Sequence, residues 1–340
     1  MAQEPTHPLL SLPDDEIFEK IREMRFEEVI EFSLISEKTK NLVKSAKLQG
    51  TDFQVEISSE VEIHFDIKKR KWERNFLKID STNRPSEVRI SSSEKPRLQE
   101  KTIWRDQCGL EDWKEHLCTI FNLRSTNYIR FGGSSDEYDP VVIKKCFGVP
   151  SRLIITTESY NHTLAILQTF LPVEHLNINS NVFRNSIKPK ILIQNFKSLI
   201  IDKVLPEHPE VVTLDDLLMT NSKQICIGNA RLGPKDINKF IKLWQHGANP
   251  RMEYLSIGCD LGDGGDHETA LKGINCTEVP NSERRWFKFG IEAKKPVRGG
   301  KNIWRTDGVK ATIQLYENYC QVYVWFDHCI CSEEPTSDNH

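Results

Sequence analysis

The sequence predicts an α+β chain in which three different periodicities follow one another. Apolar residues first recur at helical spacing, then alternate as in β-strands, and then recur as short apolar segments every 23–30 residues. These patterns predict an N-terminal three-helix unit, a strand-rich segment and a degenerate leucine-rich-repeat-like α/β solenoid that ends in a β-hairpin. We place the corresponding domains at residues 1–50, 51–124 and 125–335.

Three short helices are predicted between residues 12 and 48. Pro13 suits the start of a helix, and the carboxylates after it favour the positive end of the helix dipole. Ser36 can cap the third helix. A unit this small buries little apolar surface alone, so we expect another surface to cover part of it. Its inward positions are Ile17, Phe18, Ile21, Met24, Phe26, Val29, Ile30, Leu34, Thr39, Leu42, Val43 and Ala46, and Phe32 is apolar on the other side of the second helix.

Residues 51–124 are predicted to contain short antiparallel strands and then a helix. Apolar residues alternate in runs that begin at Phe53 and Val61, and shorter runs cover residues 76–79 and 88–90. The basic run at residues 68–71 is interpreted as a solvated turn, with nuclear localisation or phosphate binding as the alternative. Residues 91–101 are polar and predict a linker or exposed loop. The helical pattern consists of Trp104, Leu110, Trp113, Leu117, Ile120 and Phe121.

A repeat begins near residue 125. Short apolar-x-apolar segments start at Leu153, Leu176, Leu199, Ile225 and Leu255, so that successive starts are 23, 23, 26 and 30 residues apart. Residues 128–131 are an earlier candidate member. One strand and one helix per repeat favour a curved solenoid with a parallel sheet and its helices on the convex side. An ordinary α/β domain with coincidental spacing is the alternative.

Helices fit at least three of the gaps between these segments. Apolar residues between Leu164 and Leu171 indicate the first helix. Thr213 with Asp216 opens the second as a variant of a capping box. Pro234 opens the third helix and Gly247 is expected to end it.

Composition places the chain among ordinary proteins of the cytoplasm or nucleus. The net charge of −3 predicts no general attraction to nucleic acid or to membranes. The nine cysteines are an odd number without a disulfide-like spacing, as expected for a reduced compartment. No apolar run approaches the ~18–20 residues of a membrane span. The sequons at Asn161 and Asn275 are therefore interpreted as chance matches.

No constellation for catalysis, metal binding or cofactor binding is recognised. Phosphate loops, dinucleotide-binding glycine motifs, nucleophile elbows and zinc-protease motifs are absent from the sequence. The acidic stretch Asp260, Asp263, Asp266, His267 and Glu268 lacks EF-hand spacing and is interpreted as a mobile surface loop. Two groups of cysteine and histidine residues lack the spacing of a structural zinc site, so we interpret their cysteines as free thiols that bind no metal. The groups are Cys320, His328, Cys329 and Cys331, and separately Cys108, His116 and Cys118.

The N-terminal pattern resembles an F-box over residues 8–48. The order Leu-Pro, Ile-Phe, Ile, Phe, Ile, Leu-Ile-Ser, Lys, Leu-Val supports the resemblance, whereas Arg25-Phe26-Glu27-Glu28 departs from the Asp-Pro often found between the first two helices. The resemblance implies docking on the Skp-type adaptor of a cullin-RING ubiquitin ligase. Two alternatives are a helical cap on the next domain and a DNA-binding helix-turn-helix, which the acidic first two helices disfavour. The implied adaptor-binding residues are Leu12, Pro13, Ile17, Phe18, Ile21, Ile30, Leu34 and Ile35.

A second and more specific resemblance covers residues 185–257. The stretch Asp236-Ile-Asn-Lys-Phe240 through Trp244 and Gly247 to Leu255 is similar to the hallmark of the type 2 F-box-associated domain of nematode F-box proteins. Residues 214–218 and 223–227 fit the same pattern. Residues 307–313 and the strand at 319–326 also resemble the C-terminal hairpin of that family. Phe240 and Trp244 share one helix face, so we interpret the hallmark itself as scaffold.

Together the two resemblances imply a non-catalytic substrate receptor of a Skp-cullin-F-box ubiquitin ligase. Such a receptor binds the adaptor, and through it the cullin and RING subunits, and delivers an unidentified protein substrate to ubiquitination and proteasomal degradation. The alternative is a repeat-based protein-binding scaffold with a helical cap and no link to ubiquitin. Substrate is expected on the exposed concave positions, which are Ile154, Thr156, Asn177, Asn179, Ile200, Asp202, Cys226, Asn229 and Ser256.

Overall fold

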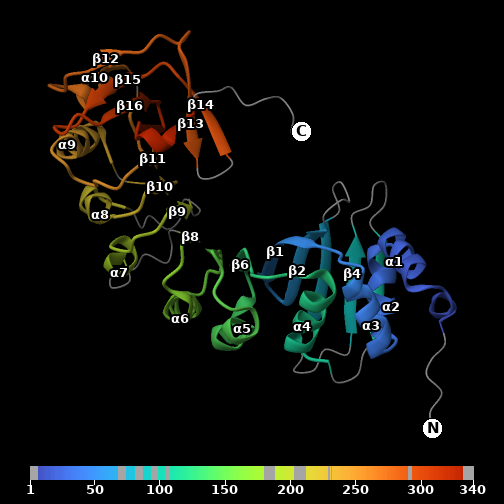
Figure 1. Ribbon diagram of the computed structural model, residues 1–340. Helices are drawn as coiled ribbons and strands as arrows, with labels where there is room; N and C mark the ends of the chain where they lie inside the picture. The colour runs from blue at the N-terminus through green and yellow to red at the C-terminus, as the bar shows by residue number, and fades with distance from the viewer. Residues whose placement is uncertain are drawn as a thin grey trace. The chain divides into compact units, whose positions relative to one another are not determined.

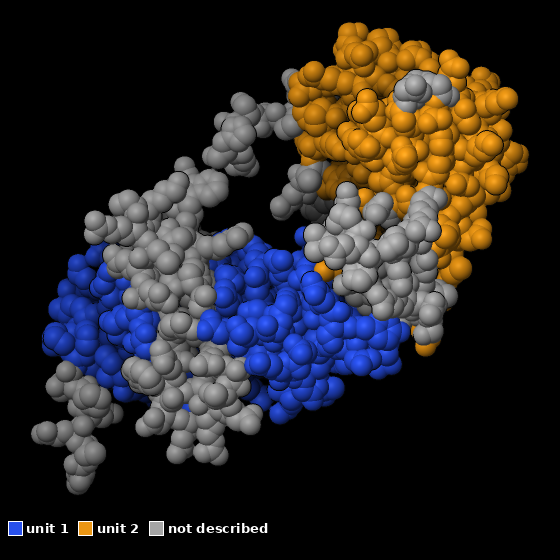
Figure 2. All heavy atoms as spheres, turned by 180° about the vertical axis from the view of Figure 1, so that it is seen from behind, with its two compact units in different colours: residues 1–173 blue, residues 174–340 orange. Residues whose placement is uncertain are grey.

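The computed structural model mixes helices with a large amount of β-sheet, and it divides into two compact units at Val173 and Glu174 (Figures 1 and 2). The predicted boundaries near residues 50 and 124 stay a prediction. The structure describes residues 7–67, 74–80, 87–92, 99–104, 108–179, 188–202, 212–228, 230, 232–262, 264–289 and 293–331. Within these residues, every helix is too short or too polar to cross a lipid bilayer.

Unit 1 begins with three helices and continues into a sheet. The helices are α1 (Asp14–Glu23), α2 (Phe26–Leu34) and α3 (Glu37–Ser45), after a 3-10 turn η1 (Pro8–Ser11). The strands are β1 (Gly50–Ile57), β2 (Glu60–Ile67), β3 (Arg74–Asp80), β4 (Glu87–Ser92), β5 (Gln99–Trp104), β6 (Tyr128–Phe131) and β7 (Arg152–Ile155). Three further helices and a 3-10 turn are α4 (Leu110–Phe121), η2 (Ser135–Glu137), α5 (Pro140–Phe147) and α6 (Tyr160–Phe170). The strand order is β7-β6-β1-β2-β3-β4-β5.

The sheet of unit 1 changes its pairing at β1. Strands β1 to β5 form an antiparallel meander, whereas β1, β6 and β7 pair in parallel. The alternating strands at Phe53 and Val61 and the helix ending at Phe121 are confirmed. The predicted linker at 91–101 is wrong at its ends, because β4 runs to Ser92 and β5 starts at Gln99. Trp104 ends β5 and does not belong to α4.

Unit 2 contains four parallel strands followed by a return in antiparallel strands. Its first strands and helices alternate: β8 (His175–Asn179), α7 (Lys188–Leu192), β9 (Ser198–Asp202), α8 (Leu214–Met219), β10 (Gln224–Ile227), α9 (Pro234–Gln245), β11 (Tyr254–Gly258) and α10 (Gly264–Leu271). The rest is β12 (Thr277–Glu278), β13 (Arg284–Phe289), β14 (Ala293–Arg298), β15 (Lys301–Trp304), β16 (Lys310–Leu315), β17 (Tyr319–Val324), η4 (Asp327–Cys329) and β18 (Ile330–Cys331). The order in the main sheet of this unit is β8-β9-β10-β11-β17-β16-β15-β12, and β14-β13-β18 form a second, small sheet.

The recurring apolar segments are aligned in register. Leu176 pairs with Leu199, Leu199 with Ile225, and Ile225 with Leu255 in unit 2. Their side chains are buried, and α7, α8 and α9 follow one another in a row (Figure 1). The predicted helix starts are confirmed: Thr213 caps α8 together with Asp216, and Pro234 is the first residue of α9. The hairpin of β16 and β17 is also confirmed.

The acidic stretch near residue 265 is a helix where a loop was predicted. Asp266, His267 and Glu268 lie in α10, which packs against α9. Gly262 precedes it with φ of 52°, a conformation that suits glycine. The side chain of Asp263 and the basic run at 68–71 lie outside the described residues.

Candidate functional site

The N-terminal helices are set in place by capping hydrogen bonds. Ser36 Oγ accepts a hydrogen bond of 3.2 Å from the backbone N–H of Thr39, which confirms Ser36 as the cap of α3. At the start of α2 the backbone N–H of Arg25 donates to Glu28 Oε2 over 2.8 Å. This hydrogen bond lowers the pKa of the Glu28 carboxyl. The departure from the Asp-Pro pattern is thus accommodated by a charged helix start.

The apolar surface of these helices is covered in part by the rest of unit 1. The ring of Phe26 stacks on Phe121 of α4 with centroids 5.6 Å apart and meets the edge of Phe65 of β2 at 5.5 Å. Next to this aromatic cluster, Ser33 Oγ and His116 Nε2 are 2.8 Å apart. The covering surface expected from the sequence is therefore supplied, at least here, by the same chain.

Burial divides the predicted adaptor-binding residues into two groups. Ile17, Ile21 and Ile30 are at most 2% exposed, so their side chains belong to the core of unit 1 and are not available at its surface. Helical spacing alone did not distinguish a face turned to a partner from one turned to the same chain, and adaptor binding stays a prediction. The residues that reach the surface are Leu12, Pro13, Phe18, Leu34 and Ile35.

Leu34 and Ile35 are the part of this surface with the most defined shape. Both line a hollow at the end of α2, together with Lys40 of α3 and His116 of α4. Ile35 also lines a second hollow beside Met24 and Phe32. Leu34 and Ile35 are two adjacent aliphatic side chains in a hollow whose other lining residues are mostly polar or charged, so they can supply a small apolar contact within a polar rim.

The predicted substrate positions of unit 2 lie on one face of the parallel strands. Asn177 pairs with Ile200, Ile200 with Cys226 and Cys226 with Ser256, so these four residues form a row across β8 to β11. Their neighbours along each strand are buried on the other face, as the alternation of a strand requires. Asn179 follows Asn177 by two residues on the same strand and pairs with Asp202.

One end of this row is covered by the small sheet of unit 2. Tyr254 of β11 and Tyr323 of β17 are buried against Phe287 of β13, and Cys226 packs against the same cluster. Cys226 therefore contacts this cluster, and all four residues of the row are partly exposed. Asn177 lies on β8 and Ile200 on β9, three and two strands away from β11 in the sheet order.

The aromatic cluster also holds a lysine that the sequence analysis did not single out. Lys295 Nζ lies 5.5 Å from the ring centroid of Tyr254 and 5.4 Å from that of Tyr323, which is cation–π geometry. Burial lowers the pKa of Lys295 and raises that of Tyr254 to about 12. Side chains two residues apart in a strand lie on the same face, so Tyr254 could have been expected on the face of Ser256. Nothing in the local sequence links Lys295 to it.

The other predicted substrate residues are separate from this row. Ile154 and Thr156 belong to unit 1, where both are partly exposed and Ile154 pairs with Arg130. The side chain of Asp202 and all of Asn229 lie outside the described residues. All nine cysteines are thiols rather than disulfides.

Comparison with known proteins identifies the central part of unit 2. Residues 188–257 match the family model described as F-box associated. The chain carries an F-box associated domain. A protein of Caenorhabditis elegans, the F-box associated domain-containing protein sdz-33, is 22% identical over 323 residues, which are 93% of this chain and 97% of that protein. The likeness to that relative extends over both units. No solved structure matches it.

In this F-box associated domain the hallmark residues are structural. Phe240 and Trp244 are buried on one face of α9, and Gly247 has φ of 100° just after the helix, where a C-terminal glycine is expected. Asn249 completes the turn: its Nδ2 donates to the carbonyl of Leu217 over 2.9 Å and to that of Thr220 over 2.7 Å. These contacts join the end of α9 to the end of α8.

Proposed function

We propose that this chain is a non-catalytic substrate receptor of a Skp-cullin-F-box ubiquitin ligase. The observation that supports the proposal most is the F-box associated domain at residues 188–257 in the same chain as the F-box-like helices α1 to α3. The receptor would act by proximity, because tethering a substrate raises its effective concentration near the charged ubiquitin-conjugating enzyme. Cullin and RING subunits would join through the adaptor, in the cytoplasm or nucleus.

In this proposal the adaptor contacts the partly exposed residues at the end of α2 and around α1. Leu34 and Ile35 supply its apolar centre, with Leu12, Pro13 and Phe18 as further contacts. Ile17, Ile21 and Ile30 are buried in the core of unit 1. The rim bears Lys40 and Glu37, which line the same hollow and can form polar contacts.

The test is the binding of purified Skp-type adaptor to the intact chain and to a Leu34→Asp/Ile35→Asp variant. We expect the variant to bind at least about a hundredfold more weakly, because two carboxylates would be buried in an apolar contact. A Val141→Asp/Val142→Asp variant is the matched control, since these adjacent helix residues are also apolar and are 61% and 57% exposed. Circular dichroism would verify that both variants are folded.

Absence of adaptor binding by the intact chain would overturn the proposal. It would favour the second candidate, a repeat-based scaffold whose N-terminal helices serve as a cap. The packing of Phe26 on Phe65 and Phe121 supports that second candidate, because a cap has to make such contacts.

We further propose that the substrate binds the open part of the row on the strands of unit 2, in a solenoid-like arrangement with the helices on the opposite face. Asn177 and Ile200 lie on strands two or more positions from β11, which packs against the small sheet, and this separation supports the choice. An Asn177→Lys/Ile200→Lys variant should lose proteins that co-purify with the intact chain from nematode extract. A Met219→Lys/Leu243→Lys variant, which changes exposed residues of α8 and α9, should retain them. Equal recovery with all three proteins, measured by quantitative mass spectrometry, would exclude this row.

A further inference from the structure

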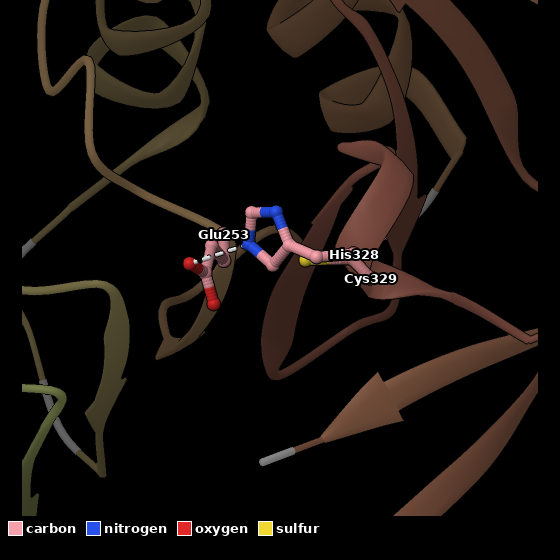
Figure 3. A group of neighbouring side chains, drawn as sticks. All are labelled: Glu253, His328 and Cys329. Carbon is pink, nitrogen blue, oxygen red and sulfur yellow. Dashed lines mark hydrogen bonds and ion pairs between the residues drawn. The ribbon is translucent and has the colours of Figure 1, made fainter. Parts of the chain in front are cut away.

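Three side chains of unit 2 with different metal-binding atoms come together at the edge of β11. Glu253 directly precedes β11, while His328 and Cys329 are in η4 near the C-terminal end of the described chain. A carboxylate oxygen, an imidazole nitrogen and the thiol sulfur all lie within 4.8 Å of one another. In Figure 3 the imidazole of His328 points at the carboxylate of Glu253, with the sulfur of Cys329 behind it.

The backbone around the three residues is fixed by hydrogen bonds. The N–H of Glu253 donates to the carbonyl of Lys223 over 2.7 Å, and the carbonyl of Glu253 accepts from the N–H of Val324 over 2.9 Å. The N–H of Cys329 donates to the carbonyl of Phe326 over 2.8 Å, and the ring of His328 stacks on that of Phe326. The donor atoms are therefore presented from two rigid segments.

We propose that Glu253, His328 and Cys329 form a binding site for a divalent cation of the zinc type. One oxygen, one nitrogen and one sulfur ligand match the preferences of zinc, and three protein ligands leave a fourth position for water or a partner's ligand. Ligands around one tetrahedral zinc lie about 3.5 Å apart. Glu253 Oε1 and His328 Nε2 are 2.9 Å apart, and the His328 side chain is 62% exposed, so it can adjust to that spacing.

Two features of the metal-free state oppose binding. Lys223 Nζ lies 2.7 Å from Glu253 Oε1 and neutralises the carboxylate, but its side chain is 39% exposed and can turn towards solvent. Burial and the neighbouring Glu253 raise the pKa of the Cys329 thiol to about 12. When the cation binds, the sulfur–metal bond replaces the S–H bond and the proton goes to solvent.

The site would connect the small sheet to the main sheet of unit 2. Ile330, next to Cys329, starts β18 and pairs with Phe287 of β13. Glu253 leads into β11, which bears Tyr254 under the same small sheet. A bound cation would therefore hold the cover over the end of the predicted substrate row.

The test is titration of the full, chelator-treated chain with Co²⁺, followed by displacement with Zn²⁺. We expect one equivalent of Co²⁺ to give a sulfur-to-cobalt charge-transfer band, and Zn²⁺ to remove the band and raise the midpoint of thermal unfolding. Both responses should be lost in His328→Ala and in Cys329→Ser. Cys331→Ser, a change at the nearest other thiol in the sequence, should keep them. Lys223→Met should bind Co²⁺ several-fold more tightly, because the competing ammonium is gone.

The exposed His328→Ala variant keeps the test decisive if Cys329→Ser does not fold. The proposal is overturned if the intact chain gives no charge-transfer band. It is also overturned if the band persists in folded His328→Ala, since His328 would then not be a ligand.

Discussion

Asn249 of unit 2 has a structural role that its position in the sequence does not reveal. Asn249 has φ of 48°, a left-handed conformation that asparagine tolerates better than most residues, and it is buried. Its amide donates to two backbone carbonyls at the C-terminal end of α8. An aliphatic residue would leave the Thr220 carbonyl without this donor, whereas the Leu217 carbonyl also accepts from the N–H of Thr220. The sequence pattern marked Gly247 as the end of this helix and gave Asn249 no role of its own.

We therefore expect Asn249→Ala to lower the free energy of unfolding by about 2–4 kcal/mol. Asn249→Gly is the matched control, because it removes the same hydrogen bonds but relieves the left-handed backbone. It should cost about 1 kcal/mol less than the alanine variant. Urea unfolding followed by circular dichroism measures both differences. If Asn249→Ala unfolded at the same urea concentration as the intact chain, these hydrogen bonds would not contribute to stability.

Secondary-structure elements show most directly how far a local pattern predicts packing. The inward positions Thr39, Leu42, Val43 and Ala46 of α3 are all buried, as their helical spacing predicts. For α1 and α2 the same rule found the apolar face but not the surface that covers it. That surface includes Phe65 and Phe121, which come 39 and 95 residues after Phe26 in the chain.

Phe26→Ala should reveal how strongly α2 is held. Removing a fully buried ring that packs on two others leaves a cavity, so we expect a loss of about 3–5 kcal/mol in the free energy of unfolding. Phe26→Leu fills most of that volume and should cost less than half as much. The measurement is the shift of the urea midpoint. An unchanged midpoint in Phe26→Ala would mean that α2 is not docked on the sheet of unit 1, and would leave its whole apolar face open to a partner.

The chain as a whole follows the order of periodicities in its sequence. Helices come first, an antiparallel meander follows, and parallel strands alternate with helices before the final hairpin. Contacts nevertheless divide the chain at Val173, inside the segment that the repeat treats as continuous. The spacing of the repeat predicts which strand residues pair with one another. It does not predict where one compact unit ends and the next begins, because that depends on contacts between distant parts of the chain.

Local physics explains what the sequence determined by itself. Periodicity, caps and turn residues act over a few neighbours, so Ser36, Thr213 and Pro234 marked their helices correctly and the apolar segments at Leu176, Leu199, Ile225 and Leu255 marked strands in register. The resemblance to F-box associated proteins rested on the same short patterns.

Only the tertiary structure decided which surfaces remain open. It placed Ile17, Ile21 and Ile30 inside unit 1, left Leu34 and Ile35 at the surface, and covered Cys226 with the small sheet. It also brought Glu253 to His328 across 75 residues. Burial and such clusters depend on contacts between distant segments, and no local pattern records which segments will meet.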